Sequence, residues 1–197
     1  MIKAIMFDAD GVLINTERFS NQLTRDYGIS TEMTKPFFEG PFAKCLTGKC
    51  DLKEEIAPYL DKWGWNKGVD AFLDYWFTSE HKVDEELVLY IQALRKQGLV
   101  CVVATNQEKH RAEYMLQKMG FENSFDGLYA SGHLGHKKPS SDFYEKVFNT
   151  FKDMNKKEVL FWDDDTENVL GAREFGINAE QYISFEDFKQ KMSSYIN

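Results

Sequence analysis

Four short segments rich in apolar residues constrain the fold of this chain more than any other feature of its sequence. They cover residues 2–7, 99–104, 126–130 and 158–162. Short runs of this kind, bounded by turn-forming residues, are typical of buried strands. Helical patterns lie between or after them, at about 84–97, 107–119, 140–151 and 166–175. Strands that alternate with helices predict an α/β fold in which helices flank a parallel sheet.

Residues 15–83 break this alternation. They contain aromatic and charged helical segments but no convincing buried strand. We therefore predict a helical subdomain at 15–83, inserted into a sheet domain made of residues 1–14 and 84–197. Because both ends of such an insert join the sheet domain near the end of the first strand, the insert is able to close over a ligand bound there.

Composition and charge narrow the classes of protein and of partner. Of the 197 residues, 43% are hydrophobic and 28% are charged, as in an ordinary folded globule. The formal net charge of −8 gives little attraction to a polyanion, so we expect no nucleic-acid partner. No apolar run has the length of a membrane span, so we expect no membrane association. Three cysteines, an odd number, and the absence of a secretory signal pattern predict reduced thiols and a cytoplasmic location.

Two aspartates follow the first predicted strand directly, in the sequence Asp8-Ala9-Asp10-Gly11. Cleavage of a phosphate ester through a covalent intermediate needs a nucleophile and a proton donor for the leaving alkoxide. Asp8 and Asp10 could divide these two tasks. A purely structural alternative is that an Asp-x-Asp-Gly sequence ends a strand and shapes a turn.

Three consecutive aspartates, Asp163, Asp164 and Asp165, follow another predicted strand. They would lie beside Asp8 if the two strands were neighbours in the sheet. Crowded carboxylates repel one another, and a hard divalent cation such as magnesium relieves that repulsion. The alternative is a solvated acidic turn that caps the helix beginning at Thr166.

Thr105, Asn106 and Lys138 are candidates for binding a phosphoryl group. Thr105-Asn106 ends a third predicted strand and offers a hydroxyl, an amide and backbone N–H groups, while Lys138 adds a positive charge. Taken singly, Thr-Asn is a common helix entry and Lys138 is a loop lysine. Taken together with the acidic groups, the set meets each requirement of phosphoryl transfer, which depends mainly on positioning and electrostatic stabilisation.

The sequence resembles the haloacid dehalogenase superfamily in four motifs spread from one end of the chain to the other. They are Asp8-Ala9-Asp10-Gly11-Val12, Val103-Ala104-Thr105-Asn106, Lys138-Pro139 and Phe161-Trp162-Asp163-Asp164-Asp165-Thr166-Glu167-Asn168. The resemblance implies a Rossmann-like core with a small helical cap inserted after the first motif, as in the phosphoglycolate phosphatase and β-phosphoglucomutase branch.

The resemblance also implies roles for the motif residues. Asp8 would be the nucleophile and a magnesium ligand, and Asp10 the general acid and base, with its backbone carbonyl on the metal. Thr105 and Lys138 would bind the phosphate, with Asn106 beside them.

The last motif supplies the remaining assignments. Asn168 stands four residues after Asp164, as the family's last motif has it. On this register Asp164 would be the third metal ligand, while Asp163 and Asn168 would support the ligands without binding the metal.

The function that we predict is a magnesium-dependent phosphatase that hydrolyses a small phosphorylated metabolite through an aspartyl phosphate on Asp8. A phosphosugar mutase would use the same residues and return the phosphoryl group to a second hydroxyl. A dehalogenase fits less well, because that branch of the family dispenses with the acid at the position of Asp10 and with magnesium. A binding or regulatory protein on the same scaffold is a third alternative, since a fold does not establish a function. We expect a monomer or a weak homodimer.

Overall fold

A five-stranded parallel sheet forms the centre of the structure, a computed structural model that describes residues 1–15 and 17–196. The strands are β1 (Ala4–Phe7), β2 (Val100–Thr105), β3 (Gly127–Ala130), β4 (Val159–Asp163) and β5 (Asn178–Gln181), in the spatial order β3-β2-β1-β4-β5. In the central strand, Phe7 pairs with Val103 of β2 and Trp162 of β4. The predicted parallel sheet is confirmed, and the carboxyl ends of β1, β2 and β4 meet at one edge.

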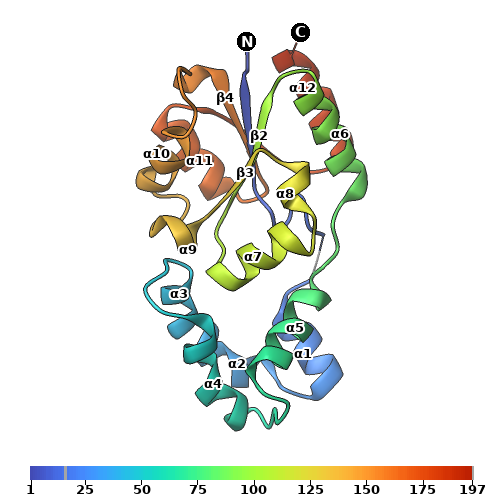
Figure 1. The fold of residues 1–197 in the computed structure, drawn as a ribbon, viewed down its shortest axis with the longest axis vertical. Coiled ribbons are helices and arrows are strands. Elements are labelled where there is room, and N and C mark those ends of the chain that lie inside the picture. The colour runs from blue at the N-terminus through green and yellow to red at the C-terminus, as the bar shows by residue number, and fades with distance from the viewer. Residues whose placement is uncertain (16, 197) are drawn as a thin grey trace.

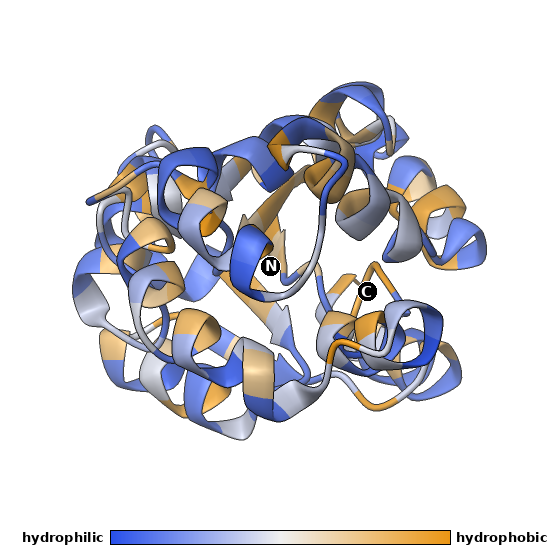
Figure 2. Cartoon of the chain, turned by 90° about the horizontal axis from the view of Figure 1, so that it is seen from below, coloured by the Kyte–Doolittle hydropathy of each residue, from blue (hydrophilic) through white to orange (hydrophobic). Residues whose placement is uncertain are grey.

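Helices cover both faces of the sheet because strand side chains point alternately to either side. Ile5 and Phe7 pack into one apolar cluster with α6 (Glu85–Lys96), α8 (Phe121–Ser124) and α12 (Phe185–Ile196). Ala4 and Met6 pack into another with α10 (Ser141–Phe148) and α11 (Thr166–Phe175). Figure 1 shows these two groups of helices on opposite sides of the strands. Figure 2, viewed along the long axis, shows the mostly hydrophobic strands between them.

Four helices around the sheet begin and end close to the predicted positions: α6 (Glu85–Lys96), α7 (Lys109–Gln117), α10 (Ser141–Phe148) and α11 (Thr166–Phe175). The structure also contains α8 (Phe121–Ser124), α9 (Ser131–Leu134), α12 (Phe185–Ile196) and a short 3-10 helix, η1 (Lys156–Glu158), which the sequence does not predict. Three of the helices around the sheet start at acidic caps: the side chains of Asp84, Glu108 and Asp165 accept hydrogen bonds from the backbone of α6, α7 and α11. Asp165 therefore has the capping role that one reading of the acidic run predicts.

Five helices form a separate group, which we call the helical unit. They are α1 (Phe19–Tyr27), α2 (Thr31–Phe38), α3 (Pro41–Cys45), α4 (Leu52–Lys62) and α5 (Val69–Ser79). The unit has its own apolar cluster, in which Phe37 and Phe72 are fully buried among other aromatic rings. Figure 1 shows it below the sheet and facing the carboxyl ends of the strands. The helical unit comprises these five helices, the loops between them and Glu80, the residue that follows α5; the remainder of the described chain is the sheet unit.

Two linkers that run side by side join the helical unit to the sheet unit. The backbone N–H of Asn15 donates to the carbonyl of Lys82 at 2.9 Å, and that of Asp84 to the carbonyl of Leu13 at 2.8 Å. The predicted domain boundaries, at 14/15 and 83/84, fall in these linkers and stay a prediction.

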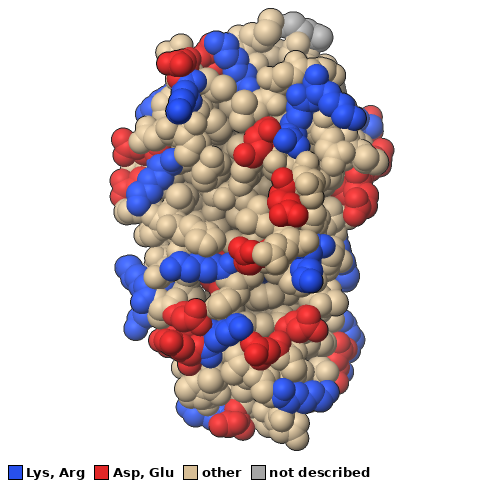
Figure 3. Space-filling view, viewed as in Figure 1, with Lys and Arg blue, Asp and Glu red and all other residues tan. Residues whose placement is uncertain are grey.

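The outer surface mixes charges of both signs. On the face shown in Figure 3, Lys and Arg side chains are interspersed with Asp and Glu. Within residues 1–15 and 17–196, every helix is too short or too polar to cross a membrane.

Candidate active site

Asp8 lies at the carboxyl end of β1, where its backbone N–H continues the sheet by donating to the carbonyl of Trp162 at 2.9 Å. The residue is only 8% exposed. One carboxylate oxygen, Oδ1, accepts from the backbone N–H of Ala9 at 2.7 Å and pairs with Lys138 Nζ at 2.8 Å. These two contacts fix the orientation of the carboxylate.

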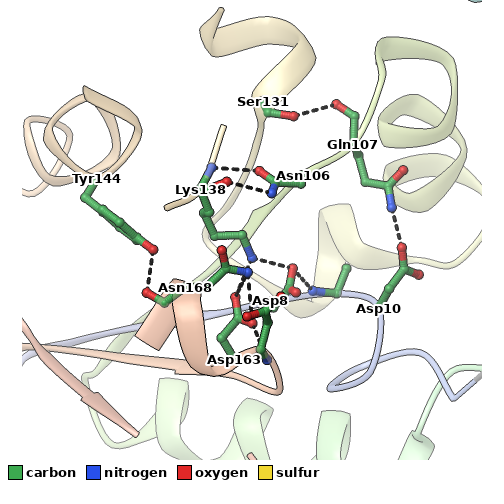
Figure 4. A network of polar contacts seen from close by, with 11 residues as sticks. Asp8, Asp10, Asn106, Gln107, Ser131, Lys138, Tyr144, Asp163 and Asn168 are labelled. Atoms are coloured by element: carbon green, nitrogen blue, oxygen red, sulfur yellow. Dashed lines mark hydrogen bonds and ion pairs between the residues drawn. The ribbon is translucent and has the colours of Figure 1, made fainter. Parts of the chain in front are cut away.

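Lys138 lies at the centre of a buried group of charges (Figure 4). It is 2% exposed, and its Nζ also contacts Asp163 Oδ2 at 2.6 Å, so one cation is shared by two carboxylates. Burial by itself would lower the pKa of Lys138, but the charges of Asp8 and Asp163 raise it above its usual value. The ammonium group therefore stays charged, as a phosphate-binding role requires.

Three carboxylates, those of Asp8, Asp163 and Asp164, come within 4.8 Å of one another. Gly11 makes room for the third, because a Cβ at this glycine would lie 2.4 Å from the carboxylate of Asp164. Oxygen atoms from a few carboxylates at this separation are a donor set that suits magnesium. The predicted neighbourhood of the first and last motifs is thus present in the fold, and the residues fit the metal.

Burial and mutual repulsion raise the pKa values of two carboxyl groups in this cluster. Burial, together with the charges of Asp163 and Asp10, raises the pKa of Asp8 to about 7, although Lys138 opposes the shift. Burial and the neighbouring Asp163 also raise the pKa of Asp164. A divalent cation between these groups would favour their ionised forms, which are the forms that attack phosphorus and bind metal.

Asp163 and Asn168 stabilise this arrangement through hydrogen bonds. Asp163 is fully buried and accepts from Lys138, from the backbone N–H of Asp165 at 2.9 Å and from Asn168 Nδ2 at 3.2 Å. Asn168 is anchored in turn, because its backbone carbonyl accepts from the Tyr144 hydroxyl at 2.6 Å. The supporting roles that the resemblance implies for Asp163 and Asn168 stay predictions.

Thr105 and Asn106 stand at the end of β2, the neighbour of β1. Thr105 is 1% exposed. Asn106 uses its side chain on the backbone of Lys138: Nδ2 donates to the carbonyl oxygen at 3.1 Å, and Oδ1 accepts from the N–H at 2.8 Å. Asn106 therefore positions the loop that carries Lys138. That Thr105, Asn106 and Lys138 bind phosphate stays a prediction.

Asp10 is the more exposed of the proposed catalytic pair and points to one side of the buried charges, toward Gln107 (Figure 4). Gln107 Nε2 donates to its Oδ2, and Arg111 Nη2 contacts its Oδ1 at 2.8 Å. Arg111 also pairs with Glu80, at the end of α5. Burial raises the pKa of Glu80 to about 7, with Arg111 opposing the shift.

The sequence did not predict roles for Gln107, Arg111 or Glu80. Gln107 directly follows the Thr105-Asn106 motif, just before the cap of α7, and Arg111 lies in the first turn of that helix. Their closeness to the motif is the one local signal for them. Glu80 has no such signal, because its contact depends on how the helical unit packs against the sheet unit.

A cleft of about 800 Å³ separates the two units on the side of Asp10. Of the predicted site residues, Asp10 and Asn106 line it. The helical unit contributes aromatic rings and charges of both signs, including Phe38, Trp76 and Lys35. A cleft of this size accommodates a small metabolite.

Comparisons with known proteins agree with this architecture. A model of the family described as haloacid dehalogenase-like hydrolase matches residues 5–180. The chain is 26% identical, over 208 aligned positions that cover 100% of both chains, to a D-ribitol-5-phosphate phosphatase of Bacteroides thetaiotaomicron. It is 25% identical to the pyrophosphatase PpaX of Halalkalibacterium halodurans, over 89% of this chain and 81% of the relative.

Solved structures show the same fold. A predicted HAD-like family hydrolase from Porphyromonas gingivalis matches with a TM-score of 0.82 and 23% identity, over 100% of this chain and 98% of the other. A variant of a HAD family enzyme from Bacteroides thetaiotaomicron, in complex with magnesium and inorganic phosphate, matches with a TM-score of 0.81 and 20% identity, over 97% and 99%. Because the family model covers most of its length, the chain belongs to the haloacid dehalogenase-like hydrolase family.

Proposed function

We propose that this protein is a magnesium-dependent phosphatase that hydrolyses a small phosphorylated metabolite through an aspartyl phosphate on Asp8. The observation that carries the proposal is the buried contact of Asp8 with Lys138, beside two further carboxylates at the edge of a parallel sheet. Family membership and relatives named as phosphatases support it.

The first chemical step forms a bond between a carboxylate oxygen of Asp8 and phosphorus, while the bond from phosphorus to the leaving oxygen breaks. Oδ1 of Asp8 is held by Ala9 and Lys138, which leaves Oδ2 as the oxygen available for attack. Asp10, which faces the cleft, gives a proton to the leaving alkoxide. Lys138 stabilises negative charge on the transferring group.

The second step releases phosphate and restores the enzyme. Asp10, now ionised, takes a proton from a water molecule that attacks phosphorus, and the bond to Asp8 breaks. Magnesium, held by Asp8, Asp164 and the backbone carbonyl of Asp10, would supply positive charge that draws the anionic substrate to a cluster of carboxylates.

The helical unit is proposed as the cap of this active site. Its aromatic and charged side chains line the cleft opposite Asp10, so it would contact the part of the substrate beyond the phosphate. The relative that aligns end to end acts, by its name, on D-ribitol 5-phosphate. A polyol or sugar phosphate is therefore the first substrate class to test. A cytoplasmic location and a monomeric or weakly dimeric state complete the proposal.

A direct test measures phosphate release from a panel of phosphorylated polyols, sugars and other metabolites, with metal-free protein and with added magnesium. We expect release that depends on magnesium and is lost in Asp8→Asn. Acid quenching during turnover of a radiolabelled substrate should trap label on the wild-type chain and none on Asp8→Asn.

Two results would contradict the proposal. Full activity of Asp8→Asn would show that Asp8 is not the nucleophile. Conversion of a sugar phosphate to its isomer without free phosphate would show a mutase instead.

A further inference from the structure

Arg111 joins three segments that are distant in the sequence. From the first turn of α7, it contacts Asp10 in the loop after β1 and Glu80 at the end of α5. Arg111 is 4% exposed and Glu80 is 7% exposed, so the guanidinium is enclosed between the sheet unit and the helical unit. Buried charges of this kind are costly to desolvate unless they are paired, so the geometry of the pairing matters.

Both carboxylate oxygens of Asp10 are held by side chains just before α7 and in its first turn. Gln107 donates to Oδ2, and Arg111 contacts Oδ1 at 2.8 Å. A carboxylate gripped at both oxygens cannot rotate freely about its terminal bond. The direction in which Asp10 faces the cleft is therefore set by these two side chains.

Glu80 fixes Arg111 from the side of the helical unit. Its carboxylate pairs with Arg111 Nη1 and also accepts from Trp76 Nε1 at 3.0 Å. Directly after Glu80, the chain enters the linker that pairs with residues 13–15. Any displacement of the end of α5 would therefore pull one carboxylate away from Arg111.

The group contains two carboxylates and one cation, so Arg111 is shared between Asp10 and Glu80. Each carboxylate takes a different nitrogen of the guanidinium, Nη2 for Asp10 and Nη1 for Glu80. Because the guanidinium is planar and rigid, the position of one carboxylate constrains the position of the other. The side chain of Asp10 is thus connected mechanically to the end of α5.

Building on the proposed phosphatase chemistry, we infer that Arg111 is a positioning residue that aims Asp10 at the leaving oxygen of the substrate, and that Glu80 makes this aim depend on the seating of the helical unit. Proton donation by Asp10 is then linked to closure of the cleft. A substrate bound under a displaced helical unit would meet an acid that is no longer held in place.

The leaving group of the substrate separates this role from a merely structural one. An alkoxide leaves slowly without a proton, whereas 4-nitrophenolate leaves readily without one. The ratio kcat/KM reports the step in which the leaving group departs when that step is irreversible. The two substrates for this test are 2-phosphoglycerol, an alkyl phosphate, and 4-nitrophenyl phosphate, both with saturating magnesium.

For Arg111→Gln, we expect kcat/KM to fall on the order of 100-fold with 2-phosphoglycerol and less than about 10-fold with 4-nitrophenyl phosphate, in line with the size of general-acid effects. Arg111→Lys should recover part of the loss. Equal losses on both substrates, or no loss, would overturn the inference.

Arg95→Gln is the matched control. Arg95 also forms a two-contact pair with an aspartate, Asp126, at 2.7 and 3.1 Å, but in the sheet unit and outside the cleft. Arg95→Gln should leave both kcat/KM values unchanged. If wild-type protein hydrolyses neither ester, the proposed function fails, which differs from a wild-type enzyme whose Arg111 variants show no leaving-group dependence.

A measurement on metal-free protein tests the link to the helical unit without turnover. Arg111→Gln should speed backbone hydrogen exchange in residues 76–84, while β1 and β4 keep their protection as evidence of an intact fold. Glu80→Gln should speed exchange in residues 76–84 to a smaller degree, because the amide oxygen can still accept a hydrogen bond from Arg111. Unchanged exchange in both variants would contradict the role of Glu80.

Discussion

The sheet unit buries an ion pair at its edge, whereas the helical unit carries ion pairs on its surface. At the sheet edge, Lys138 and Asp163 are paired with almost no exposure to solvent. In the helical unit, Lys53 and Asp70 pair at 2.7 Å with 46% and 84% of their side chains exposed. Buried charges interact strongly and cost much to leave unpaired, whereas exposed pairs contribute little. The sheet unit thus concentrates electrostatic strain at one point, which is where the proposed chemistry lies.

The two units agree in how they are packed. Each has a fully enclosed aromatic residue in its own apolar cluster, Phe143 beside the sheet and Phe72 among the five helices. Separate cores joined by a pair of linkers are compatible with the proposal that the sheet unit carries the reacting groups and the helical unit encloses the substrate. Substitutions in each unit test how far the two differ.

The largest effect should follow from removal of the nucleophile. Asp8→Asn keeps the size of the side chain but cannot form the aspartyl phosphate, so kcat should fall on the order of 10⁴-fold or more. Steady-state phosphate release measures this, and circular dichroism checks that the fold is kept. The control is Asp74→Asn, which removes an acid from the helical unit and should leave kcat unchanged.

Removal of the buried cation should reveal the strain at the sheet edge. Lys138→Met leaves Asp8 and Asp163 facing each other without compensation, and the loss of one partner of a buried pair costs about 3–5 kcal/mol of unfolding free energy. Lys53→Met, the exposed counterpart, should cost less than about 1 kcal/mol. Urea unfolding of both variants without metal tests the contrast. Equal losses would show that the two units do not differ in this respect.

Much of the sheet edge could be predicted from the sequence because local and global signals agree there. β1, β2 and β4 are apolar runs that stop at polar residues, and neighbouring parallel strands bring those residues together. β5 was not predicted, since Asn178–Gln181 is an edge strand with a single apolar residue, Ala179. α12 was also missed, although Phe188 and Met192, four residues apart, do carry a helical signal.

The contact between the units could not be predicted in the same way. Arg111 and Glu80 meet only after the helical unit has packed against α7, and neither residue belongs to a local pattern that requires the other. The sequence also gives no sign that the side chain of Asn106 hydrogen-bonds the backbone of Lys138, because this contact depends on a loop with no periodic signal. Sequence patterns specify the ends of regular elements better than they specify contacts between loops.

Loss of an aromatic core residue should distinguish the two cores. Phe72 packs edge-on against Phe19 and Trp65 with ring centroids 5.6 and 5.2 Å away, and Phe72→Ala should cost about 3–5 kcal/mol within the helical unit. Backbone hydrogen exchange should speed up in α1–α5 while the sheet keeps its protection. Phe143→Ala, the matched change in the sheet unit, should reduce the protection of the strands. Uniform loss in both variants would show a single cooperative unit.

The smallest expected effect is a change in stability with pH and magnesium, because protons and magnesium compete for Asp8 at the sheet edge. The pKa of Asp8 is raised from 3.8 to about 7, so between these values the folded protein holds a proton that the unfolded chain has released. Without metal, this group therefore makes the unfolding free energy fall as pH rises from about 4 to 7. Magnesium binds the ionised form, so its stabilisation should grow over the same range.

Thermal unfolding of wild type and Asp8→Asn, with and without magnesium, measures this competition. At 100 times its Kd, magnesium should raise Tm by roughly 5–10 °C at pH values above the pKa of Asp8 and by less at lower pH. Glu80 has a similarly raised pKa but lies in the contact between the units, so its contribution should persist in Asp8→Asn. The part of the pH dependence of Tm that magnesium removes therefore belongs to the sheet edge. A rise in Tm with magnesium that does not change with pH would place the metal away from Asp8.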